Sequence, residues 1–385
     1  MPTDPVQLMR GRVLHVMECT IGGTRRHLGD VTRGLLARGW DVHLAVSAER
    51  TAGFRLDMAE LERLGAVIHE LPMVRSVSPL RDRGHAVELT RLMRELRPDI
   101  VHTHSSKAGA LGRRAAAAAG CRAVVHTPHT YSFLFGEMFG SLTRWVFRSV
   151  ERRLSRLAHR IIAVSEDEAE TMKASGVVAP AQVRVVPNCI DVDPLACAAP
   201  VVPEGASEGK TSVLVCGLLN SAKGQDLAIA ALESPGCEQV ELWLAGEGAM
   251  ADELLNQAAV LGVLDRVRFL GHREDVPGLM RGADLLLLPS RWEGMPYVVL
   301  EAAAADLPIV ATPVDGAREF LAGDLRGWTA EDSTVESIGA SLGAAASASA
   351  ADRATRSLRA KQWVLDRHAA DRMMDAMEAV YAELL

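Results

Sequence analysis

The chain has 385 residues, of which 48% are hydrophobic and 24% charged, so it is long enough for two or three domains with well-filled cores. Its formal net charge of −7 gives no general attraction to phosphate backbones and argues against nucleic acid as a partner. We see neither a leader-like start nor a run of about 18 apolar residues, so we expect a cytoplasmic protein without a membrane span. The six cysteines form no CxxC pair, which favours reduced thiols over a disulfide or zinc framework.

Short runs of β-branched residues and leucine alternate with helical patterns through the first half of the chain. Strands are predicted over residues 12–17, 41–47, 66–72, 100–105, 123–129, 160–165 and 183–188. Helical spacing of apolar residues fills the gaps, as from Lys107 to Ala118 and from Glu137 to Leu157. Repeated strand, helix, strand order predicts a parallel sheet covered on both faces.

The second half repeats this alternation. Further strands are predicted over residues 211–217, 240–246, 267–271, 284–290 and 307–312. The segment 187–209 has four prolines and no sustained period, as expected of a linker. We therefore predict an α/β protein whose two doubly wound, Rossmann-like domains, 1–186 and 210–365, face each other across a central cleft. The helical pattern from Thr355 to Leu385 predicts that its last part, residues 366–385, forms a helix crossing back over the first domain.

Two glutamates near the end of a predicted buried strand suggest a binding site. In "PSRWEGMPYVVLEA", Glu293 lies in the loop after the strand, and Glu301 lies on the helix that Pro296 can begin. Ligands of parallel sheets bind at the carboxyl ends of the strands, and a helix amino end favours phosphate. One carboxylate could then hold the diol of a ribose and the other the hydroxyls of a sugar, although an isolated pair of this spacing is usually two solvated helix residues.

The surrounding motifs favour a ligand site over two solvated glutamates, because the chain resembles the retaining GT-B glycosyltransferases of family 4 nearly from end to end. The motifs follow the order and spacing of that family: IGGTRRHL (21–28), VHTHSSKAGALGRRAA (101–116), HTPHTYSF (126–133), VPNCIDVD (186–193), GLLNSAKGQDLAIAAL (217–232), AGEG (245–248), FLGHREDVPGLMRGADLLLLPSRWEGMPYVVLEA (269–302) and ATPVDGAREF (311–320). The resemblance implies the GT-B fold and sugar transfer from a nucleotide sugar. It also implies that Glu293 faces the donor sugar and that Glu301 binds the ribose.

The resemblance further assigns Lys223 to the donor diphosphate, where a cation stabilises the charge of the leaving group. It places Gly217, Gly294, Met295 and Pro296 among the donor-binding residues.

The chain departs from the family at three positions. The arginine that usually follows the strand glycine is Leu218, for which Arg25, Arg291 or Arg318 could compensate. Cys189 and Asp306 replace glycines of two turns.

The first domain should contribute His129 and Thr130, which lie at the end of the predicted strand 123–129 and reach the cleft. By resemblance, His129 contacts the donor sugar and assists at the reacting centre. The ends of neighbouring strands also carry His102, His104 and His126, which raises the alternative of a zinc site. No cysteine or carboxylate accompanies these histidines, and we assign neither a metal nor another cofactor.

Two more features belong to the predicted site. Gly22 and Gly23 begin a helix without the G-x-G-x-x-G pattern, which argues against a nicotinamide cofactor and favours close approach of a phosphate or acceptor. Arg273, in the loop after "FLG", is a candidate for stacking on the nucleotide base.

Residues 133–160 combine arginines with aromatic and aliphatic side chains. A basic amphipathic helix can lie on an anionic membrane, but Leu154 and Leu157 continue an apolar face that a core would use. We expect core packing, with peripheral membrane contact as the alternative.

The predicted function is a retaining, metal-independent hexosyl transfer from a nucleotide sugar, with a UDP-hexose or UDP-N-acetylhexosamine favoured as donor. The acceptor hydroxyl, on a small molecule, a glycan or a lipid-linked substrate, cannot be read from the sequence. Two alternatives remain: a GT-B protein that acts as an epimerase or pseudo-glycosyltransferase, and a nucleotide-sugar-binding protein without turnover, which Leu218 would suit.

Overall fold

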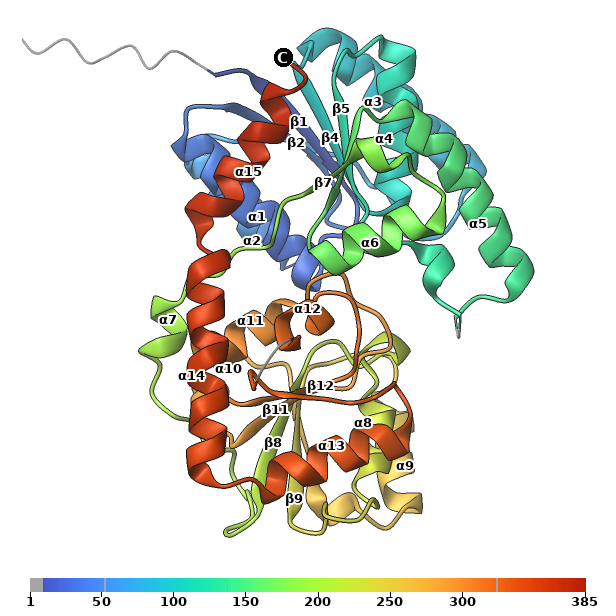
Figure 1. Cartoon of the computed structure of the whole chain (residues 1–385). Coiled ribbons are helices and arrows are strands. Elements are labelled where there is room, and N and C mark those ends of the chain that lie inside the picture. The colour runs from blue at the N-terminus through green and yellow to red at the C-terminus, as the bar shows by residue number, and fades with distance from the viewer. Residues whose placement is uncertain (1–9, 52, 137, 323–324) are drawn as a thin grey trace, which may run out of the picture. The chain divides into compact units, whose positions relative to one another are not determined.

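The computed structural model describes residues 10–51, 53–136, 138–322 and 325–385. The chain divides into two compact units (Figure 1). The N-terminal unit comprises the residues up to Asn188 together with Ala370–Leu385, and the C-terminal unit comprises Cys189–Ala369.

Among its described residues, the N-terminal unit holds a parallel sheet of seven strands in the order β3-β2-β1-β4-β5-β6-β7. The strands are β1 (Arg12–Met17), β2 (Asp41–Val46), β3 (Val67–Glu70), β4 (Ile100–His104), β5 (Val124–Thr127), β6 (Arg160–Ala163) and β7 (Val183–Val185). Most central-strand residues are buried, which explains why the strands read as nearly continuous apolar runs.

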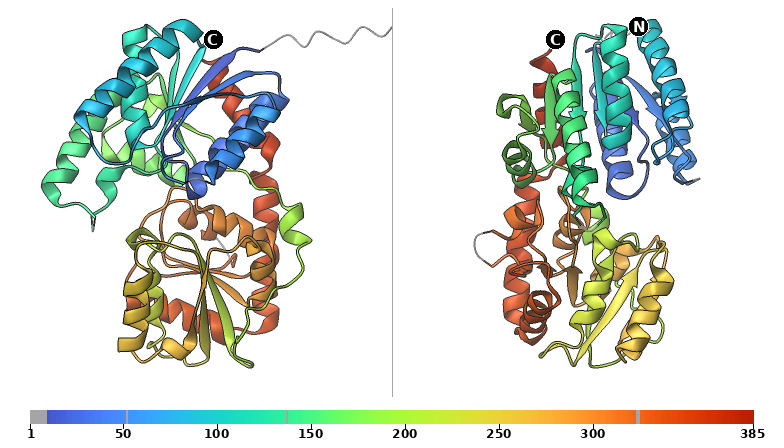
Figure 2. Two further views of the ribbon diagram at one scale, coloured as in Figure 1. Left: turned by 180° about the vertical axis from the view of Figure 1, so that it is seen from behind. Right: turned by 90° about the vertical axis from the view of Figure 1, so that its right-hand side faces the viewer.

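Helices cover both faces of this sheet (Figure 2). They are α1 (Gly22–Ala37), α2 (Phe54–Arg63), α3 (Pro79–Leu96), α4 (Ser106–Ala119), α5 (Ser141–Leu154), α6 (Glu166–Ser175) and α15 (Ala370–Ala382). On one face, α3 and α4 pack over a core that includes Leu14, Val101 and Leu89. On the other face, α15 lies beside α1 (Figure 1).

The C-terminal unit holds a parallel sheet of six strands in its described part, in the order β10-β9-β8-β11-β12-β13. The strands are β8 (Thr211–Cys216), β9 (Val240–Ala245), β10 (Val267–Gly271), β11 (Leu285–Leu288), β12 (Ile309–Ala311) and β13 (Trp328–Thr329). The helices are α7 (Asp193–Ala196), α8 (Gln225–Ala231), α9 (Ala251–Val260), α10 (Val276–Gly282), α11 (Tyr297–Ala304), α12 (Ala317–Leu321), α13 (Val335–Ser347) and α14 (Ala350–Arg367). The prediction of two doubly wound α/β sheets is confirmed.

The boundaries of the units differ from the predicted ones in ways that packing explains. The predicted linker 187–209 belongs almost entirely to the C-terminal unit, where α7 contacts α10 and α11. Val201 fits against Gly278 and Gly282, where a Cβ atom would approach Val201 to 2.6 and 2.1 Å respectively. The segment therefore packs as part of the unit although it lacks a regular period.

The predicted C-terminal helix is interrupted. α14 ends at Arg367, and the carbonyl of His368 accepts a hydrogen bond from the amide of Ile190 at 2.9 Å. The His368 ring lies 4.8 Å from the Trp363 ring, so this bend is anchored by both backbone and side chain. After it, α15 returns to the N-terminal unit, as the sequence predicted for this segment.

Residues 133–160 correct another prediction. The expected helix from Glu137 begins at Ser141 in α5, while Glu137 itself lies outside the described residues. Core packing holds for Leu154 and Glu151, but Leu142 and Trp145 are 73% and 65% exposed. Val146 and Val150 are exposed as well, because no neighbouring element among the described residues covers this side of α5.

Candidate functional site

An ion pair joins the two loops that follow β8 and β11. The Lys223 ammonium lies 2.6 Å from Oε1 of Glu293, and the Ser290 hydroxyl donates to the same oxygen at 2.9 Å. Both side chains are partly buried, at 27% and 15% exposed. The pair thus lies at the carboxyl ends of adjacent parallel strands, where ligands of such sheets bind.

The turn that carries Lys223 is held by its own residues. Asn220 accepts a hydrogen bond from the Lys223 amide at 3.2 Å and caps the short 3-10 helix Ser221–Lys223. Gly224 follows with a φ of +67°, and a Cβ there would lie 2.0 Å from the carbonyl oxygen of Pro289. Only glycine lets this turn lie directly against the β11 loop.

The start of α11 is built in a similar way. Gly294, Met295 and Pro296 are buried, and Pro296 is the N-cap rather than a residue of the helix, one position from its predicted place. Gly316 has a φ of +74°, and a Cβ there would lie 2.7 Å from the Gly294 carbonyl oxygen. The loop before α12 is therefore pressed onto the loop before α11.

Glu301 lies on α11 and is partly exposed. Burial, with a further contribution from the negative charge of Glu301, strongly raises the pKa of the Cys216 thiol. Cys216 is the last residue of β8, so the Glu301 carboxylate is close enough to act on the end of that strand. Gly217 comes next, in contact range of the Lys223 stem. The structure thus brings Gly217, Lys223, Glu293 and Glu301 to one edge of the sheet.

The arginines considered as substitutes at the Leu218 position differ in their surroundings. Arg291 pairs with Asp226 at 2.6 Å and donates to the carbonyl of Ser221 at 2.8 Å, so its guanidinium adjoins the Lys223 turn. Arg318 pairs with Asp315 at 2.6 Å. Arg25 pairs with Asp57 and belongs to the N-terminal unit. Within the C-terminal unit, Arg291 is therefore the arginine placed beside the lysine.

Two other predicted residues lie at loop positions with clear local geometry. Arg273 forms a two-bond pair with Asp275, at 2.8 and 2.6 Å. This pairing raises the pKa of Arg273 and lowers that of Asp275. Asp306, at the glycine position after α11, adopts a φ of 59°, the left-handed conformation that the turn requires.

In the N-terminal unit, His129 and Thr130 follow β5 with φ values of 52° and 77°. Such values are uncommon outside glycine and costly for a β-branched residue, and they cluster at functional loops. The strained loop is held by Glu168, whose carboxylate accepts from the Thr130 amide at 2.8 Å and from the Val164 amide at 2.7 Å. Gly22 and Gly23 begin α1 in the same unit, as predicted.

The histidines of this unit do not group as the metal alternative supposed. His126 bonds to Thr103, whereas the close groups among the described residues are His15, His102 and His104, and His27, His104 and His129. His15 bonds to His104 at 3.0 Å, and His104 bonds to His129 at 3.3 Å. In both contacts the rings are nearly coplanar, at 26° and 18°.

The ring centres of His15 and His104 lie 5.3 Å apart, and those of His104 and His129 lie 5.6 Å apart. In both pairs this distance exceeds the distance between the two contacting nitrogens, 3.0 and 3.3 Å, by the same amount. The nitrogens therefore point at one another, as hydrogen bonding requires. In each of the two groups, one ligand atom of every histidine also lies within 4.8 Å of the others, a spacing that could hold a metal ion.

The sequence reasoning missed four residues of this unit: His15, His27, Glu168 and Asn188. Glu168 had a local signal, because Ser165 and Glu168 have the spacing of a capping box and Ser165 caps α6. His27 bonds to Asn188 at 3.0 Å across 161 positions, and the sequence holds no local signal of that contact.

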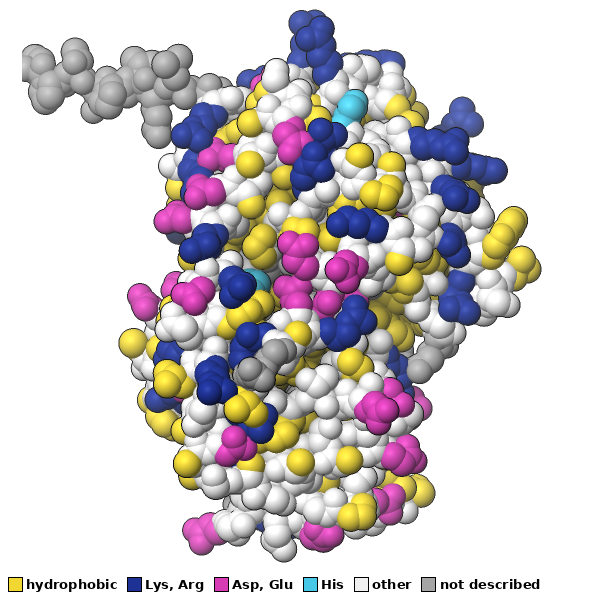
Figure 3. All heavy atoms as spheres, viewed as in Figure 1, with side chains coloured by type: hydrophobic (Ala, Val, Ile, Leu, Met, Phe, Trp, Pro, Cys, Tyr) yellow, Lys and Arg dark blue, Asp and Glu magenta, His cyan; other side chains and the backbone are white. Residues whose placement is uncertain are grey.

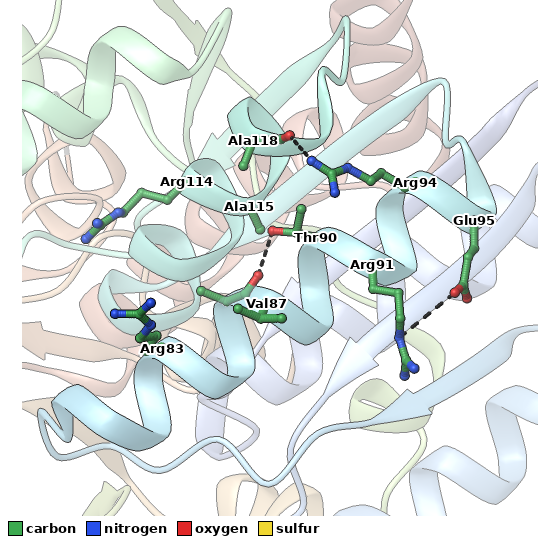
Figure 4. A pocket seen from close by; sticks show the side chains of 10 residues that line it. Arg83, Val87, Thr90, Arg91, Arg94, Glu95, Arg114, Ala115 and Ala118 are labelled. Atoms are coloured by element: carbon green, nitrogen blue, oxygen red, sulfur yellow. Dashed lines mark hydrogen bonds and ion pairs between the residues drawn. The ribbon is translucent and has the colours of Figure 1, made fainter.

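A shallow groove of about 760 Å³ lies between α3 and α4 (Figure 4). The exposed arginines that line it are Arg83, Arg91, Arg94 and Arg114. None of the predicted site residues lines this groove, so it is separate from the features described above.

Comparisons with known proteins agree with this architecture. Residues 21–194 match the profile of Glycosyltransferase Family 4, and residues 210–346 match that of Glycosyl transferases group 1. A glycogen synthase of Mycobacterium tuberculosis is 30% identical over 335 residues, which cover 78% of this chain and 77% of that protein.

Another relative is the UDP-Gal:alpha-D-GlcNAc-diphosphoundecaprenol alpha-1,3-galactosyltransferase of Escherichia coli. It is 28% identical over 69% of this chain and 71% of its own length. Among solved structures, Anabaena HepE in complex with UDP and glucose superposes with a TM-score of 0.78 at 22% identity, covering 97% of this chain and 100% of HepE. WaaG, a glycosyltransferase involved in lipopolysaccharide biosynthesis, superposes with a TM-score of 0.71 at 18% identity, covering 96% of this chain and 99% of WaaG. From the two matching profiles and these relatives, we conclude that the chain belongs to the family 4, group 1 glycosyltransferases of the GT-B fold.

Proposed function

We propose that this glycosyltransferase transfers a hexose or N-acetylhexosamine from a UDP-sugar to an acceptor hydroxyl, with retention of the anomeric configuration. The observation that carries the proposal is the Lys223–Glu293 pair at the ends of β8 and β11. This pair supports the proposal because an ammonium that suits a diphosphate lies beside a carboxylate that suits sugar hydroxyls. The UDP-galactose named in the E. coli relative and the UDP bound by HepE support uracil as the base.

In the proposed mechanism, residues of the C-terminal unit hold the donor. Lys223 and the positive end of the α11 dipole meet the diphosphate, whose charge grows as the glycosidic bond breaks. Arg291, bonded to the Lys223 turn, supplies a second positive charge nearby. Glu301 accepts hydrogen bonds from the ribose, and Glu293 accepts them from the sugar.

The leaving phosphate oxygen takes the acceptor's proton, so the scheme needs neither a metal nor a covalent nucleophile. Gly217, Gly294, Met295 and Pro296 line the donor's path in this proposal. Arg273 stacks on the base once Asp275 releases it. The roles of Gly22, Gly23, His129 and Thr130, which belong to the other unit, stay predictions.

A donor screen tests this function. Free UDP and the UDP-, GDP- and ADP-sugars are each added to the full chain, and the shift in Tm is measured. Binding to the folded state stabilises it by about 2.7 kcal/mol at a hundredfold excess over Kd, so we expect UDP and one UDP-sugar to raise the Tm.

Analysis of products then separates the alternatives. Transfer to an added acceptor supports the proposal, an altered donor without acceptor indicates an epimerase, and binding without product indicates a protein that has lost turnover. Stabilisation by GDP- or ADP-sugars alone would overturn the choice of base.

We further propose that α5 brings the enzyme to an anionic membrane surface. Its exposed apolar residues, Leu142, Trp145, Val146 and Val150, alternate with arginines, and its one carboxylate, Glu151, is buried against Arg113. Figure 3 shows basic and hydrophobic side chains together at the edge of the N-terminal unit where Figure 1 labels α5. This combination is typical of helices that lie in the interface of acidic lipids.

No helix among the described residues is long and apolar enough to cross a bilayer, so a peripheral contact is the form of association we propose. Co-sedimentation with vesicles tests it. Binding should occur with phosphatidylglycerol vesicles, weaken with salt, and fall in Trp145→Ala and Arg148→Glu. Leu56→Ala, which changes an equally exposed leucine on α2, should leave binding unchanged. Equal binding to neutral phosphatidylcholine vesicles would contradict the charge argument.

A further inference from the structure

A row of hydrogen-bonded imidazoles leads through the N-terminal unit to His129. His15 on β1 and His104 on β4 lie on the same face of two adjacent strands, and His129 follows β5. His15 Nδ1 contacts His104 Nε2 at 3.0 Å, and His104 Nδ1 contacts His129 Nε2 at 3.3 Å. We call these three residues the histidine row.

All three rings are neutral near pH 7. Burial lowers the pKa of His15 to about 3 and those of His104 and His129 well below 6.5, with neighbouring histidines adding to the effect. A neutral imidazole has one N–H and one bare nitrogen. His104 can therefore donate in only one direction, and the two hydrogen bonds must run the same way along the row.

Two arrangements satisfy this condition. In the first, His15 donates from Nδ1 to His104, His104 donates from Nδ1 to His129, and the proton of His129 is on Nδ1. In the second, every bond is reversed, and the proton of His129 is on Nε2. They differ in what they leave at the buried end of the row.

The buried end of the row, at His15, distinguishes the two hydrogen-bond arrangements. His15 is fully buried, and its Nε2 has no partner. The reversed arrangement would place an N–H at this nitrogen, and buried N–H groups without an acceptor are rarer than unsatisfied acceptors. The first arrangement leaves a bare nitrogen there instead.

His27 shows the same choice. Its Nδ1 contacts the Oδ1 of Asn188 at 3.0 Å, so the proton is on Nδ1 and the bare Nε2 is left without a partner.

We propose that His15 and His104 are positioning residues that fix His129 as its Nδ1–H tautomer, so that His129 presents an N–H donor, and not a basic nitrogen, to its ligand. The tautomer follows from the row alone; that the ligand is a hydroxyl or phosphate of a nucleotide sugar rests on the proposed function. With its bare nitrogen engaged by His104, His129 is not available as the base that an inverting transfer would need.

Nitrogen NMR of histidine tests the tautomer in the ligand-free full chain. When both ring nitrogens of histidine are labelled, each neutral tautomer gives its own pattern of long-range couplings between these nitrogens and the ring protons. The signals are assigned by single substitutions in the row. We expect the Nδ1–H form at His15, His104 and His129, and an Nε2–H form at His129 would overturn the proposal.

Two variants of His15 separate positioning from packing. His15→Asn keeps an N–H donor near the position of Nδ1, whereas His15→Leu removes it. We expect His129 to stay Nδ1–H in His15→Asn and to shift toward Nε2–H in His15→Leu. The control His85→Leu removes a buried histidine outside the row and should leave the His129 spectrum unchanged. If His15→Leu does not fold, the wild-type spectrum still decides the tautomer.

Kinetics separate this proposal from the proposed function. With a donor identified by the screen, His15→Leu should lower kcat/KM by roughly three- to tenfold, the effect of one neutral hydrogen bond, and His15→Asn should restore it. A protein without transfer activity but with the Nδ1–H row would refute the function alone. Transfer that is equal in His15→Leu and wild type would refute the role given to His15.

Discussion

The Lys223 ammonium and the Glu293 carboxylate lie 2.6 Å apart although 70 positions separate them in the sequence. A bound diphosphate would compete with Glu293 for the lysine, and a released Glu293 could then accept hydrogen bonds from sugar hydroxyls. In this structure the Glu293 carboxylate thus takes the place that a diphosphate would have beside Lys223. The Lys223 ammonium likewise takes the place that sugar hydroxyls would have beside Glu293.

Lys223→Ala should slow transfer by roughly two to three orders of magnitude, because one preorganised charge opposite the leaving diphosphate is lost. The measurement is kcat at saturating donor. Lys210→Ala, which changes the lysine before β8 instead of the one after it, should retain full activity. A loss smaller than about fivefold would assign the diphosphate to other groups, with Arg291 tested next.

Glu301→Ala should weaken binding of free UDP. Two ribose hydrogen bonds to a charged acceptor are lost, each worth about 1.5–3 kcal/mol. Calorimetry gives the Kd directly, with Glu253→Ala on the exposed side of α9 as the matched control. An unchanged Kd would remove Glu301 from the ribose.

The product should keep the anomeric configuration of the donor. Proton NMR reports this through the anomeric coupling constant, which is small for an axial linkage of a gluco-configured sugar. A large coupling from a donor with an axial phosphate would mean inversion. Both the retaining assignment and the role of Glu293 would then have to be withdrawn.

Arg113 and Glu151 form a buried ion pair that ties α5 to α4, with bonds of 2.6 and 3.0 Å. Arg113→Met should lower the free energy of unfolding by about 3–5 kcal/mol, because an unpaired carboxylate remains buried. Replacing both residues by Met should recover most of this loss. Arg55→Met, in an exposed pair with Glu70, should cost less than about 1 kcal/mol. Denaturant titration measures the free energy of unfolding of the wild type and of the three variants. A double variant as unstable as Arg113→Met would contradict the argument.

Stability should fall in mild acid. The folded-state pKa is about 3 for His15 and about 4 for His27, against an ordinary value of 6.5. From 6.5 down to about 4 the unfolded chain binds protons that the folded chain does not, so the free energy of unfolding decreases as the pH falls. Each such histidine contributes at most about 1.4 kcal/mol per pH unit.

Denaturant titrations at several pH values in this window give the free energy of unfolding as a function of pH. The slope of that free energy against pH should be smaller in His27→Leu than in wild type. His272→Leu, which changes an exposed histidine, should leave the slope unchanged. A constant free energy of unfolding over the window would show that the rings can take up protons while buried.

The strands and the loop that carries Glu293 could be predicted because they depend on local patterns. Buried parallel strands read as apolar runs, and Pro296 marks the start of a helix. β13 was missed because two residues carry too little periodicity.

The histidine row could not be predicted, because the local sequence does not show which strands are neighbours. Alternation places His102 and His104 on one face of β4, but that β1 lies beside β4 follows only from the strand order. The exposure of α5 is a similar case. Its pattern identifies an apolar side, whereas whether another element covers that side is a tertiary fact.

The return of α15 to the N-terminal unit has a consequence for biosynthesis. Tyr381 bonds to His102 at 2.8 Å, and Glu378 accepts from the Trp40 indole at 2.8 Å and the Arg38 guanidinium at 2.7 Å. These contacts join the last helix to strands and helices that leave the ribosome first. Domains generally fold as they emerge, N-terminal first. Here the first sheet must wait until all of Cys189–Ala369 has been synthesised before its final helix arrives, so a released chain that ends before Ala370 should hold a folded C-terminal unit and an incomplete N-terminal one.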